Sequence, residues 1–499
     1  MKNQLFHLAV FSILSIISFG QNGTRLIGFD AVTSGRGGTV TGTFDNPSLM
    51  MNNPAGISFM KSSQADLGIS VMAPTISFKN DLNNTNGKDN YFPLGFLGYV
   101  HPGSKKISWG AGIFTQGGMG ADFTLDHALY KDGGGNYVPQ DYHSKFAVMQ
   151  GGASLGYKIN PQFSIGVTAN MVYGQVEFSM PMSMPPSMMK GVVNPATGMT
   201  FGDLFSAPPE SGGLGYTEVV ASANMQKLTS VGFNGKIGIA YKPNEKFSAG
   251  INYSLPVNLS YENGKTSMDM TYQMNDAFNK VVGGIMQQVP GTTPEQAQQM
   301  AMQAFTQMGI DFSKGAKDEY DSKAKFGLPQ SIAAGLSYAP SKKWRVALDA
   351  EWIIWDKAFD QMNISLTGGT NDNINRMMGT EGNIAMAFPM YWKNTVVIRT
   401  GAEYFASTLL TLRAGYAYGS NPVPSCTVFP LFPAIVQHHA TAGASINVSK
   451  AFAINAAYEH AFKAEQNADA ESHVGNEYNN STSGLQNSIF HVSVSWKLK

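Results

Sequence analysis

The sequence has a single cysteine, few charged residues and no net charge. Cys426 has no second cysteine to pair with, so an intramolecular disulfide is excluded. Charged residues make up 14% of the 499 residues, below the roughly 25% of an ordinary soluble domain. The 34 basic residues balance the 34 acidic ones, which gives no support for binding to nucleic acid. The composition therefore excludes a disulfide-stapled scaffold and favours no polyanionic partner.

Long hydrophobic runs are also missing, apart from the N-terminus. Residues 1–20 begin with a positive charge, continue with a short apolar core and end in small residues, which is typical of a secretory signal peptide. A membrane-anchoring helix is the alternative, but the core is shorter than the about 20 residues that a spanning helix needs. No cysteine lies at the expected cleavage point, which argues against a lipoprotein. We expect residues 1–20 to be removed on secretion.

The rest of the chain combines a high apolar content with an absence of apolar runs. Hydrophobic residues make up 43% of the sequence, glycine occurs 54 times and aromatic residues reach 11%. Because no later stretch could cross a bilayer as a helix, these residues are expected to alternate along strands. Abundant glycine and aromatic residues are typical of strands that present an aromatic girdle to lipid.

Fourteen segments after residue 64 have the composition of β-strands. They are predicted at 65–79, 91–101, 106–116, 145–158, 162–179, 226–241, 246–262, 326–339, 343–357, 394–405, 409–418, 437–448, 452–463 and 487–498. Short turns alternate with the long excursions 80–90, 117–144, 180–225, 263–325, 358–393, 419–436 and 464–486. Bacterial outer-membrane barrels have an even strand number, short periplasmic turns and long outer loops. The sequence therefore predicts an all-β fold, a transmembrane antiparallel β-barrel of 14 strands over residues 65–499.

Side-chain alternation within the predicted strands supports a barrel in a membrane. In the segment 487–498, the even positions from 490 onward are apolar, and the odd positions from 491 onward are polar. In the segment 343–357, the even positions 344–354 are apolar, and the odd positions include an arginine and two acidic residues. The apolar set would face lipid and the polar set the lumen. Closure is expected because an open sheet edge in hydrocarbon would leave backbone groups without partners.

The stretch between the signal peptide and the first strand, residues 21–64, is apolar without being regular. Glycines and prolines between residues 35 and 56 exclude a regular helix or strand. A solvated linker would not hold apolar residues such as Phe29, Val40 and Ile57 in this number. We expect this stretch to pack inside the barrel as a plug, called the hatch below.

One outer excursion is rich in methionine and another is partly helical. The excursion 180–225 begins within SMPMSMPPSMMK, residues 179–190, where the prolines exclude a helix. The excursion 263–325 has helical spacing at 276–289 and again after Thr293-Pro294-Glu295-Gln296, a capping box. Thioethers adapt to irregular ligands, so a capture groove is predicted between these loops. Loop packing and copper binding are the alternatives. The residues predicted to line the groove are Met182, Met184, Met188, Met300 and Phe305.

Three arginines are predicted to face the lumen, namely Arg345, Arg399 and Arg413. The acidic residues Asp349, Glu351 and Glu403 are predicted on the same face. The arginines either brace the wall in a charge ladder or hold the carboxylate of a ligand by a bidentate pair. The sequence alone leaves both roles open.

Motifs for catalysis or metal binding do not stand out. The chain has no His-Glu-x-x-His and no Cys-x-x-Cys pattern. The glycine-rich residues 34–38 lack the Gly-Lys-Ser/Thr ending of a phosphate loop. His438 and His439 are strand neighbours that point to opposite faces, so they are not expected to chelate a metal. We predict no enzyme activity, no cofactor and no metal site.

Several separated stretches resemble the FadL/TodX-like family of outer-membrane transporters for hydrophobic compounds. They are residues 28–56, ending in Asn53-Pro54-Ala55-Gly56, then 117–123, 326–331 with 352–356, and 392–404 with 412–416, Pro422 and Pro424. Each stretch alone is short, and their order together is specific. The resemblance implies a 14-stranded barrel plugged by an N-terminal hatch, in the outer membrane of a Gram-negative bacterium.

The resemblance also implies a function. Long-chain fatty acids or aromatic hydrocarbons would be captured among outer loops, pass an interior pocket touched by the hatch and leave sideways beside a kinked third strand. Transport would be passive, by a monomer in contact with outer-membrane lipid and without nucleic acid or cofactor. The implied hatch residues are Phe29, Asn53, Pro54, Ala55 and Gly56. The implied kink residues at the lateral exit are Gly117, Gly118 and Gly120.

Other functions remain as alternatives. The chain ends in Trp496-Lys497-Leu498-Lys499, without the terminal aromatic residue common in outer-membrane barrels. A barrel whose loops serve adhesion or surface recognition, without transport, is the main rival. A general polar porin is a third possibility, and the apolar hatch argues against it.

Overall fold

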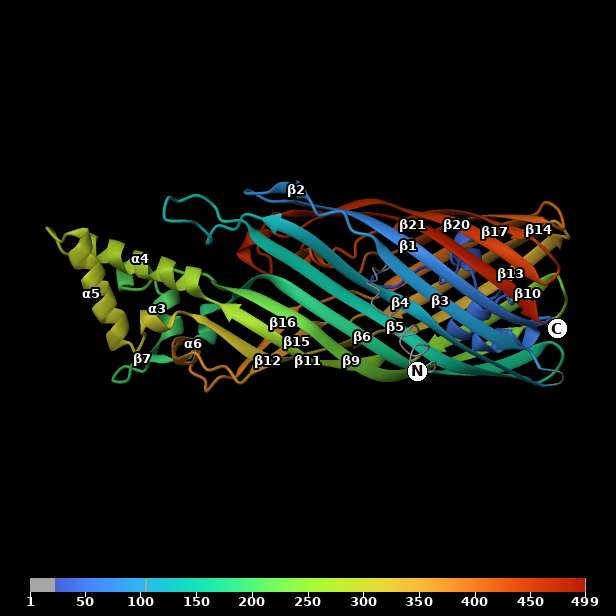
Figure 1. Cartoon of the computed structure of the whole chain (residues 1–499), viewed down its shortest axis with the longest axis horizontal. Helices are drawn as coiled ribbons and strands as arrows, with labels where there is room; N and C mark the ends of the chain where they lie inside the picture. The colour runs from blue at the N-terminus through green and yellow to red at the C-terminus, as the bar shows by residue number, and fades with distance from the viewer. Residues whose placement is uncertain (1–22, 104–105, 499) are drawn as a thin grey trace, which may run out of the picture.

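The structure is a computed structural model that describes residues 23–103 and 106–498, so the predicted signal peptide lies outside the described residues. One antiparallel sheet closes on itself where β1 (Ser63–Lys79) pairs with β21 (Thr482–Leu498) along their whole lengths. The result is a closed barrel of 14 wall strands, longer than it is wide (Figure 1). The predicted fold class and strand number are confirmed.

Ten wall strands are continuous and four are interrupted. The other continuous strands are β3 (Phe92–His101), β4 (Ile107–Leu125), β5 (Gln140–Lys158), β6 (Phe163–Met184), β9 (Val219–Tyr241), β18 (Leu410–Gly419), β19 (His438–Asn447) and β20 (Phe452–Asn467). The interrupted strands are β10 (Phe247–Ser254) with β11 (Val257–Asp269), β13 (Gln330–Ser341) with β12 (Lys317–Leu328), β14 (Trp344–Ile354) with β15 (Gln361–Thr367), and β17 (Thr395–Phe405) with β16 (Ile384–Pro389). Short strands in the outer loops are β2 (Asn84–Asn86), β7 (Val192–Asn194) and β8 (Met199–Thr200).

Helices occupy both ends of the barrel. Inside it lie α2 (Ala31–Gly35) and the 3-10 turns η1 (Pro47–Met51) and η2 (Pro54–Phe59). In Figure 1 the outer helices lie at the end opposite the C-terminus, and they are α3 (Phe201–Ser206), α4 (Thr271–Gln288), α5 (Pro294–Gln307) and α6 (Asp372–Met378). Short 3-10 turns lie at 186–188, 209–211, 312–314, 425–427 and 476–478. Among the described helices, none has the length and apolar character needed to cross a bilayer.

The predicted start of α5 is confirmed by its capping geometry. The Thr293 side chain accepts a hydrogen bond from the Gln296 amide at 3.3 Å, and the Gln296 side chain accepts one from the Thr293 amide at 3.0 Å. This reciprocal pair satisfies two backbone donors that a helix start would leave free. Pro294 occupies the first helical position, where the missing amide proton costs nothing.

The half of the wall nearer the C-terminus is apolar outside and polar inside, as predicted. Phe490 and Trp496 are 58% and 57% exposed on the outer face of β21, whereas His491 and Ser495 on the inner face are buried. Strand β6 has the same alternation of apolar outer and polar inner side chains, with Val167 facing outward. This exposed apolar belt is what a barrel presents to lipid.

The wall extends further at the outer end than the sequence predicts, and this is a correction. Strand β4 runs to Leu125 rather than residue 116, β6 runs to Met184 rather than 179, and β9 begins at Val219 rather than 226. The reason is that the polarity reverses in this outer tier. On β6, Glu177 faces outward while Phe178 and Met180 are buried inside. A search for apolar residues on the outside therefore assigns these segments to loops.

The hatch also differs from the predicted irregular chain, because it contains short helical turns. Asp30 caps α2 by accepting hydrogen bonds from the amides of Val32 and Thr33 at 2.8 and 3.0 Å. The turns η1 and η2 each begin with a proline. The glycines and prolines thus limit each turn to five or six residues instead of excluding helical structure.

Candidate functional site

The described hatch residues that precede β1, 23–62, fill the barrel at the end where the C-terminus lies (Figure 1), and β1 begins at Ser63 rather than at the predicted residue 65. Its helix α2 contacts β18, β19, β20 and β21, and its turn η2 contacts β4, β5, β6, β9 and β10. Polar residues on the inner wall bond to the hatch backbone. Thr168 Oγ1 donates to the carbonyl of Met50 at 2.7 Å, and Ser164 Oγ donates to the carbonyl of Ala55 at 2.8 Å. The hatch therefore forms a second, hydrogen-bonded layer inside the wall.

Inward-facing glycines of the wall let the hatch backbone lie against the strands. A Cβ added at Gly415 would lie 2.1 Å from the Gly37 nitrogen, and one at Gly166 would lie 2.4 Å from the Ala55 nitrogen. Neither position has room for a side chain. On other strands, an added Cβ would likewise lie under 3 Å from a hatch atom at Gly98, Gly112, Gly156, Gly238, Gly250, Gly335 and Gly401. These glycines form a seat that fits the hatch.

The N-terminal part of the hatch is held by a buried ion-pair chain. Arg25 donates from Nη1 to Glu351 Oε1 at 2.7 Å and to Ser331 Oγ at 3.2 Å. The other oxygen of Glu351 accepts a hydrogen bond from Arg399 at 2.9 Å. Both Glu351 and Arg399 lie on the inner wall and are more than nine-tenths buried. One wall carboxylate is thus shared between a hatch cation and a wall cation.

A second ion-pair chain holds the middle of the hatch. Arg36 binds Asp45 with both terminal nitrogens, at 2.8 and 3.0 Å. Arg345 on the wall contacts both Asp45 and Glu403, and Glu403 also accepts a hydrogen bond from Arg413 at 2.8 Å. Against the effect of burial, the charges of Arg345 and Arg36 hold the pKa of Asp45 below its usual range. The Asp45 carboxylate is therefore charged and joins the hatch to the wall.

Hydrogen bonds outside the two ion-pair chains complete the attachment of the hatch. One oxygen of Asp349 accepts hydrogen bonds from the amides of Val40 and Thr41, both at 2.8 Å. The Asn53 amide donates to the carbonyls of Thr41 and Ile239 at 2.9 and 3.1 Å. Asn53 therefore links two parts of the hatch to β9.

The implied hatch residues all lie in this buried layer. Phe29 contacts Phe114 of β4 edge to face, with ring centroids 4.7 Å apart. Asn53 and the three residues that follow it are buried and begin the turn η2. Their position against the wall strands is a geometric fact, and a role in transport stays a prediction.

The three lumenal arginines each have a carboxylate partner. Arg345 and Arg413 contact Glu403, and Arg399 contacts Glu351. These pairs favour the role of bracing the wall. The binding of a ligand carboxylate by one of these arginines stays a prediction. Arg345 also lines a pocket of about 260 Å³ at the inner end of the hatch.

The wall is interrupted laterally beside β4. The ladder between β3 and β4 runs from His101↔Trp109 to Phe96↔Phe114 and ends there, whereas the ladder between β4 and β5 continues to Leu125↔Gln140 with a shift before Gly117. Gly117 has a φ of 157°, and an added Cβ would lie 1.8 Å from the Thr24 carbonyl oxygen. A bulge with glycine is what re-aims a strand in this way.

The start of the hatch lies against the interruption. The Gly118 amide donates to the Thr24 carbonyl at 3.0 Å, and Arg25 forms an antiparallel bridge with Gly117. The hatch thus supplies backbone contacts to the part of β4 that has left β3. The predicted kink glycines therefore lie at a break in the wall that the hatch covers.

Two small apolar cavities lie between the hatch and the outer end of the barrel. The kink cavity, with room of about 20 Å³, is lined by Pro74, Ile76, Met119, Gly120, Pro433, Ala434, Leu485 and Asn487. The outer cavity has the same room and is lined by Phe178, Met182, Ser183, Met184, Ala221, Ala223, Met225, Thr266, Met268, Ile364, Leu366 and Met386. Each has space for about one water molecule.

The lining of the outer cavity comes partly from the two excursions between which the sequence predicts a groove, and Ile364, Leu366 and Met386 come from a third excursion, 358–393. Met182 and Met184 lie in the outer end of β6, and Met268 lies at the end of β11. The other predicted groove residues lie elsewhere. Met188 packs partly buried against the core, Met300 is 43% exposed on α5, and Phe305 lies in the α4–α5 hairpin against Phe278 and Phe312.

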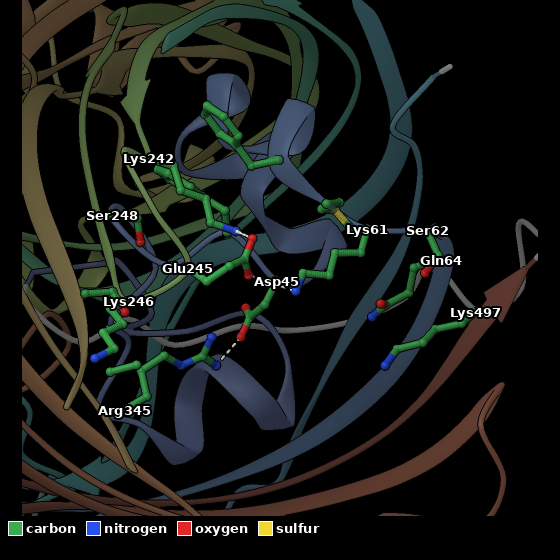
Figure 2. Close-up of a pocket in the computed structure, with 15 residues that line it drawn as sticks. Asp45, Lys61, Ser62, Gln64, Lys242, Glu245, Lys246, Ser248, Arg345 and Lys497 are labelled. Carbon is green, nitrogen blue, oxygen red and sulfur yellow. Dashed lines mark hydrogen bonds and ion pairs between the residues drawn. The ribbon is translucent and has the colours of Figure 1, made fainter. Parts of the chain in front are cut away.

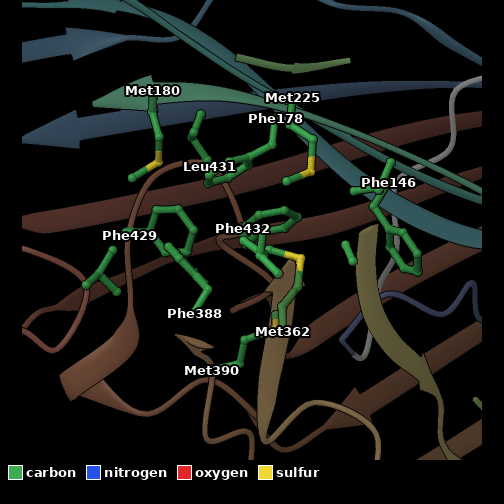
Figure 3. Close-up of a cluster of buried hydrophobic side chains, with 14 of the residues drawn as sticks. Phe146, Phe178, Met180, Met225, Met362, Phe388, Met390, Phe429, Leu431 and Phe432 are labelled. Carbon is green, nitrogen blue, oxygen red and sulfur yellow. The ribbon is translucent and has the colours of Figure 1, made fainter. Parts of the chain in front are cut away.

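A segment between β18 and β19 contacts both cavities. Residues 428–436, VFPLFPAIV, are all buried, and we call them the insert. Phe432 of the insert stacks on Phe178 with centroids 5.7 Å apart and rings at 17°. Figure 3 shows Phe429, Leu431 and Phe432 of the insert among side chains of the outer tier. Ser144 Oγ anchors it by donating to the Leu431 carbonyl at 2.6 Å.

The insert lies in the predicted outer excursion 419–436, although its composition indicates a buried position. Its composition matches that of the hatch, with bulky apolar residues interrupted by prolines. The same argument that places the hatch inside the barrel applies to residues 428–436.

Residues that suggest catalysis or metal binding have structural partners. His438 is exposed beside Tyr416, and His439 is buried and contacts Glu459 at 3.2 Å, so the two histidines face opposite ways. A Gly-x-Ser-x-Gly pattern does occur, at residues 152–156, but it lies within β5. A nucleophile elbow requires a turn from a strand into a helix. Ser154 instead bonds to Thr168 at 2.7 Å.

Comparisons with known proteins agree with this architecture. A search of curated protein sequences finds no match. The toluene transporter TodX of Pseudomonas putida has a TM-score of 0.66 at 19% identity, covering 95% of this chain and 99% of that one. A FadL homologue of Pseudomonas aeruginosa has a TM-score of 0.66 at 16% identity, covering 96% and 100%. The toluene transporter TbuX of Ralstonia pickettii has a TM-score of 0.62 at 16% identity, covering 95% and 99%.

These structural likenesses concern the fold, and a sequence comparison shows the family. The sequence model of a family described as outer membrane protein transport protein (OMPP1/FadL/TodX) matches residues 30–496. This range includes most of the hatch and nearly all of the wall. The chain therefore belongs to the FadL/TodX family of outer-membrane transport proteins, and its barrel lies in the outer membrane.

Proposed function

We propose that the protein is a passive importer of small hydrophobic molecules, which enter at the outer end and leave sideways into the membrane beside Gly117. The observation that carries this proposal is that the insert contacts both apolar cavities, with Pro433 and Ala434 lining the kink cavity and Phe432 stacked on Phe178 of the outer cavity. An apolar solute gains nothing from a watery pore, so a route from an apolar interior into lipid is favourable.

Capture is proposed at the outer cavity. It holds about one water molecule in the closed state, so a ligand must displace side chains to enter. Its lining includes Met182, Met184, Met225, Met268 and Met386, whose unbranched side chains repack at low cost. Phe178 lines this cavity and also stacks on Phe432, so ligand entry would push on the insert.

Release is proposed through the interruption between β3 and β4. Pro433 and Ala434 of the insert line the kink cavity together with Met119 and Gly120 of β4. A shift of the insert would therefore join the two cavities. Thr24 and Arg25 cover the break from inside, so the start of the hatch must also move.

The lining of the two cavities favours neutral hydrocarbons as the ligand. Their polar members are Ser183, Thr266 and Asn487, and no basic side chain lines either cavity. A carboxylate would find no cation there, and burying it without a partner would be costly. Two structural relatives are named as toluene transporters, which agrees with this choice. Long-chain fatty acids are the second candidate, for which one of Arg345, Arg399 and Arg413 is the predicted carboxylate ligand.

The test is uptake of labelled toluene and labelled oleate into liposomes that contain the purified protein. We expect the intact barrel to raise toluene uptake over empty liposomes, and to raise oleate uptake less. A barrel without residues 23–59 is the second arm, because it leaves the interruption uncovered. Equal uptake of both compounds by the intact barrel and by empty liposomes would contradict import and favour the adhesion alternative.

A further inference from the structure

A polar pocket of about 260 Å³ lies between the hatch and the wall, at the end opposite the outer cavity. Figure 2 shows basic side chains from several segments around it. Its basic members are Lys61, Lys242, Lys246, Arg345 and Lys497, and its acidic members are Asp45 and Glu245. Hydroxyl and amide groups of Ser62, Gln64, Ser248 and Ser337 complete the polar lining. The pocket takes no part in the apolar route proposed above.

Both acidic groups of the pocket are already engaged. Asp45 is held by Arg36 and Arg345, and Glu245 contacts Lys61 at 2.8 Å and Lys242 at 3.4 Å. Among the described residues, no carboxylate lies within 4.0 Å of the amino group of Lys246 or of Lys497. The pocket therefore has a surplus of positive charge that its own carboxylates do not neutralise. A concave site lined by one sign of charge concentrates ions of the opposite sign.

The position of the pocket decides where an occupant would come from. Lys497 continues the inward-facing row of Ser493 and Ser495 on β21, and Lys242 and Lys246 flank the short turn after β9. In this family of barrels the short turns lie on the periplasmic side. The pocket thus opens inside the barrel rim toward the periplasm, and an occupant would arrive from water, not from the bilayer.

We propose that this pocket binds a small multivalent oxyanion, a phosphate or a polycarboxylate, from the periplasm. The basic side chains that would hold the anion come from three parts of the chain, the end of the hatch at Lys61, the turn at Lys246 and the last strand at Lys497. Oxyanions accept several charge-assisted hydrogen bonds at once, which suits this arrangement of amino groups and hydroxyls. An anion that binds the hatch and the wall together stabilises the closed hatch. This site is independent of which hydrophobic compound is imported.

The test uses the purified mature protein in detergent, with citrate and inorganic phosphate as probes and sodium chloride at the same ionic strength as reference. Calorimetry measures binding, and hydrogen exchange of residues 59–64 reports on the hatch. We expect saturable binding of at least one probe and slower exchange in its presence. The variant Lys246→Gln with Lys497→Gln should weaken binding about fivefold for each lost charge. Lys450→Gln, in a turn at the same end and outside the pocket, is the matched control.

Each outcome decides the proposal. Loss of binding in the double variant with retention in the Lys450→Gln control supports the site. Equal binding in all variants, an equal effect of chloride, or no binding by the native protein overturns it. The assay contains no hydrophobic ligand, so a failure here leaves the import proposal untouched, and a failure of uptake leaves this site standing.

Discussion

Arg25 of the hatch donates a hydrogen bond to Glu351 of the wall at 2.7 Å. The residue before it, Thr24, accepts the hydrogen bond from Gly118 at the break in β4. The ion pair and the cover of the lateral break therefore belong to two consecutive residues of the hatch, Thr24 and Arg25. Any movement that uncovers the break must first separate Arg25 from Glu351, or move both together.

Removal of the Glu351 charge should loosen the start of the hatch. In Glu351→Gln, both Arg25 and Arg399 lose their carboxylate partner, and breaking a buried pair costs about 3 kcal/mol or more. We expect faster hydrogen exchange at residues 23–28 and faster uptake. The matched control is Lys265→Gln, which breaks an exposed pair with Asp321 and should leave both the hydrogen exchange and the uptake unchanged. Unchanged exchange in Glu351→Gln would show that this pair does not hold the hatch.

Filling the glycine seat should expel the hatch. A side chain at Gly415 meets the Gly37 nitrogen, whereas Gly95 on β3 has nothing within 4 Å of an added Cβ. We expect Gly415→Val to raise ion conductance in planar bilayers, because the lumen loses its plug, and Gly95→Ala to stay closed. A closed, folded Gly415→Val barrel would mean that the hatch adapts to the lost space.

The break in the wall should depend on its glycines. Valine at positions 117 and 118 favours a regular strand that could pair with β3, and its bulk also conflicts with Thr24. We expect Gly117→Val with Gly118→Val to slow uptake of toluene. Circular dichroism checks that the variant is folded. Unchanged hydrogen exchange at residues 23–28 would indicate that the wall has sealed, whereas faster exchange there would indicate that the hatch has lost its contacts with β4. Normal uptake by the folded variant would remove the lateral route.

The insert should control passage between the cavities. Phe432→Ala removes the ring that stacks on Phe178, which leaves space between the cavities and costs about 3–5 kcal/mol if the space stays open. We expect faster uptake of bulky hydrocarbons. Phe305→Ala is the control, because it removes an equally buried ring from the α4–α5 hairpin. If both variants change uptake alike, general destabilisation explains the effect and the insert is no barrier.

The outer loop that covers the insert should open as the pH rises. Burial raises the pKa of Glu477 to about 8, and its carboxylate accepts a hydrogen bond from Tyr142 at 2.6 Å. A raised carboxyl pKa means that the folded loop holds a proton that the unfolded loop loses above about pH 4.5. Stability is therefore full below that pH and falls until about pH 8. We expect protection of residues 468–481 to fall by roughly 2 kcal/mol from pH 6 to pH 8.

The comparison variant for this pH effect is Glu477→Gln, which keeps the side-chain shape and has no proton to lose. Its loop protection, corrected for the chemical exchange rate, should not change between pH 6 and pH 8. An equal pH dependence in the native protein and in the variant would assign the effect to another group.

Much of the membrane part of the fold follows from local sequence patterns. Val167 and Phe490 mark the lipid side of their strands because alternation has a period of two, and Thr293 marks a helix start because capping is local. The strand number and the capping box are therefore predictable. The outer tier is not, because at Glu177 and Phe178 the polarity of the two faces reverses without any change of period.

The lumenal partners depend on the three-dimensional arrangement. The sequence places Arg345 and Glu403 on the inner face, but Asp45, which joins them, lies 300 residues away from Arg345. The insert was predictable in principle from its apolar and proline-rich composition. The surplus charge near Lys246 and Lys497 was not, because these residues meet only after the barrel closes.

The reversal of polarity along β6 has a consequence for biogenesis. The outer face of the same strand carries the exposed, apolar Val167 and, further along, the half-buried, ion-paired Glu177, so it is built for two surroundings in succession. If the strand hairpins are inserted from the periplasm, the charged exterior of the outer tier must cross the hydrocarbon layer before the apolar belt can come to rest in it. The free-energy barrier to insertion then depends on how far that tier extends along the barrel axis, rather than on the number of strands.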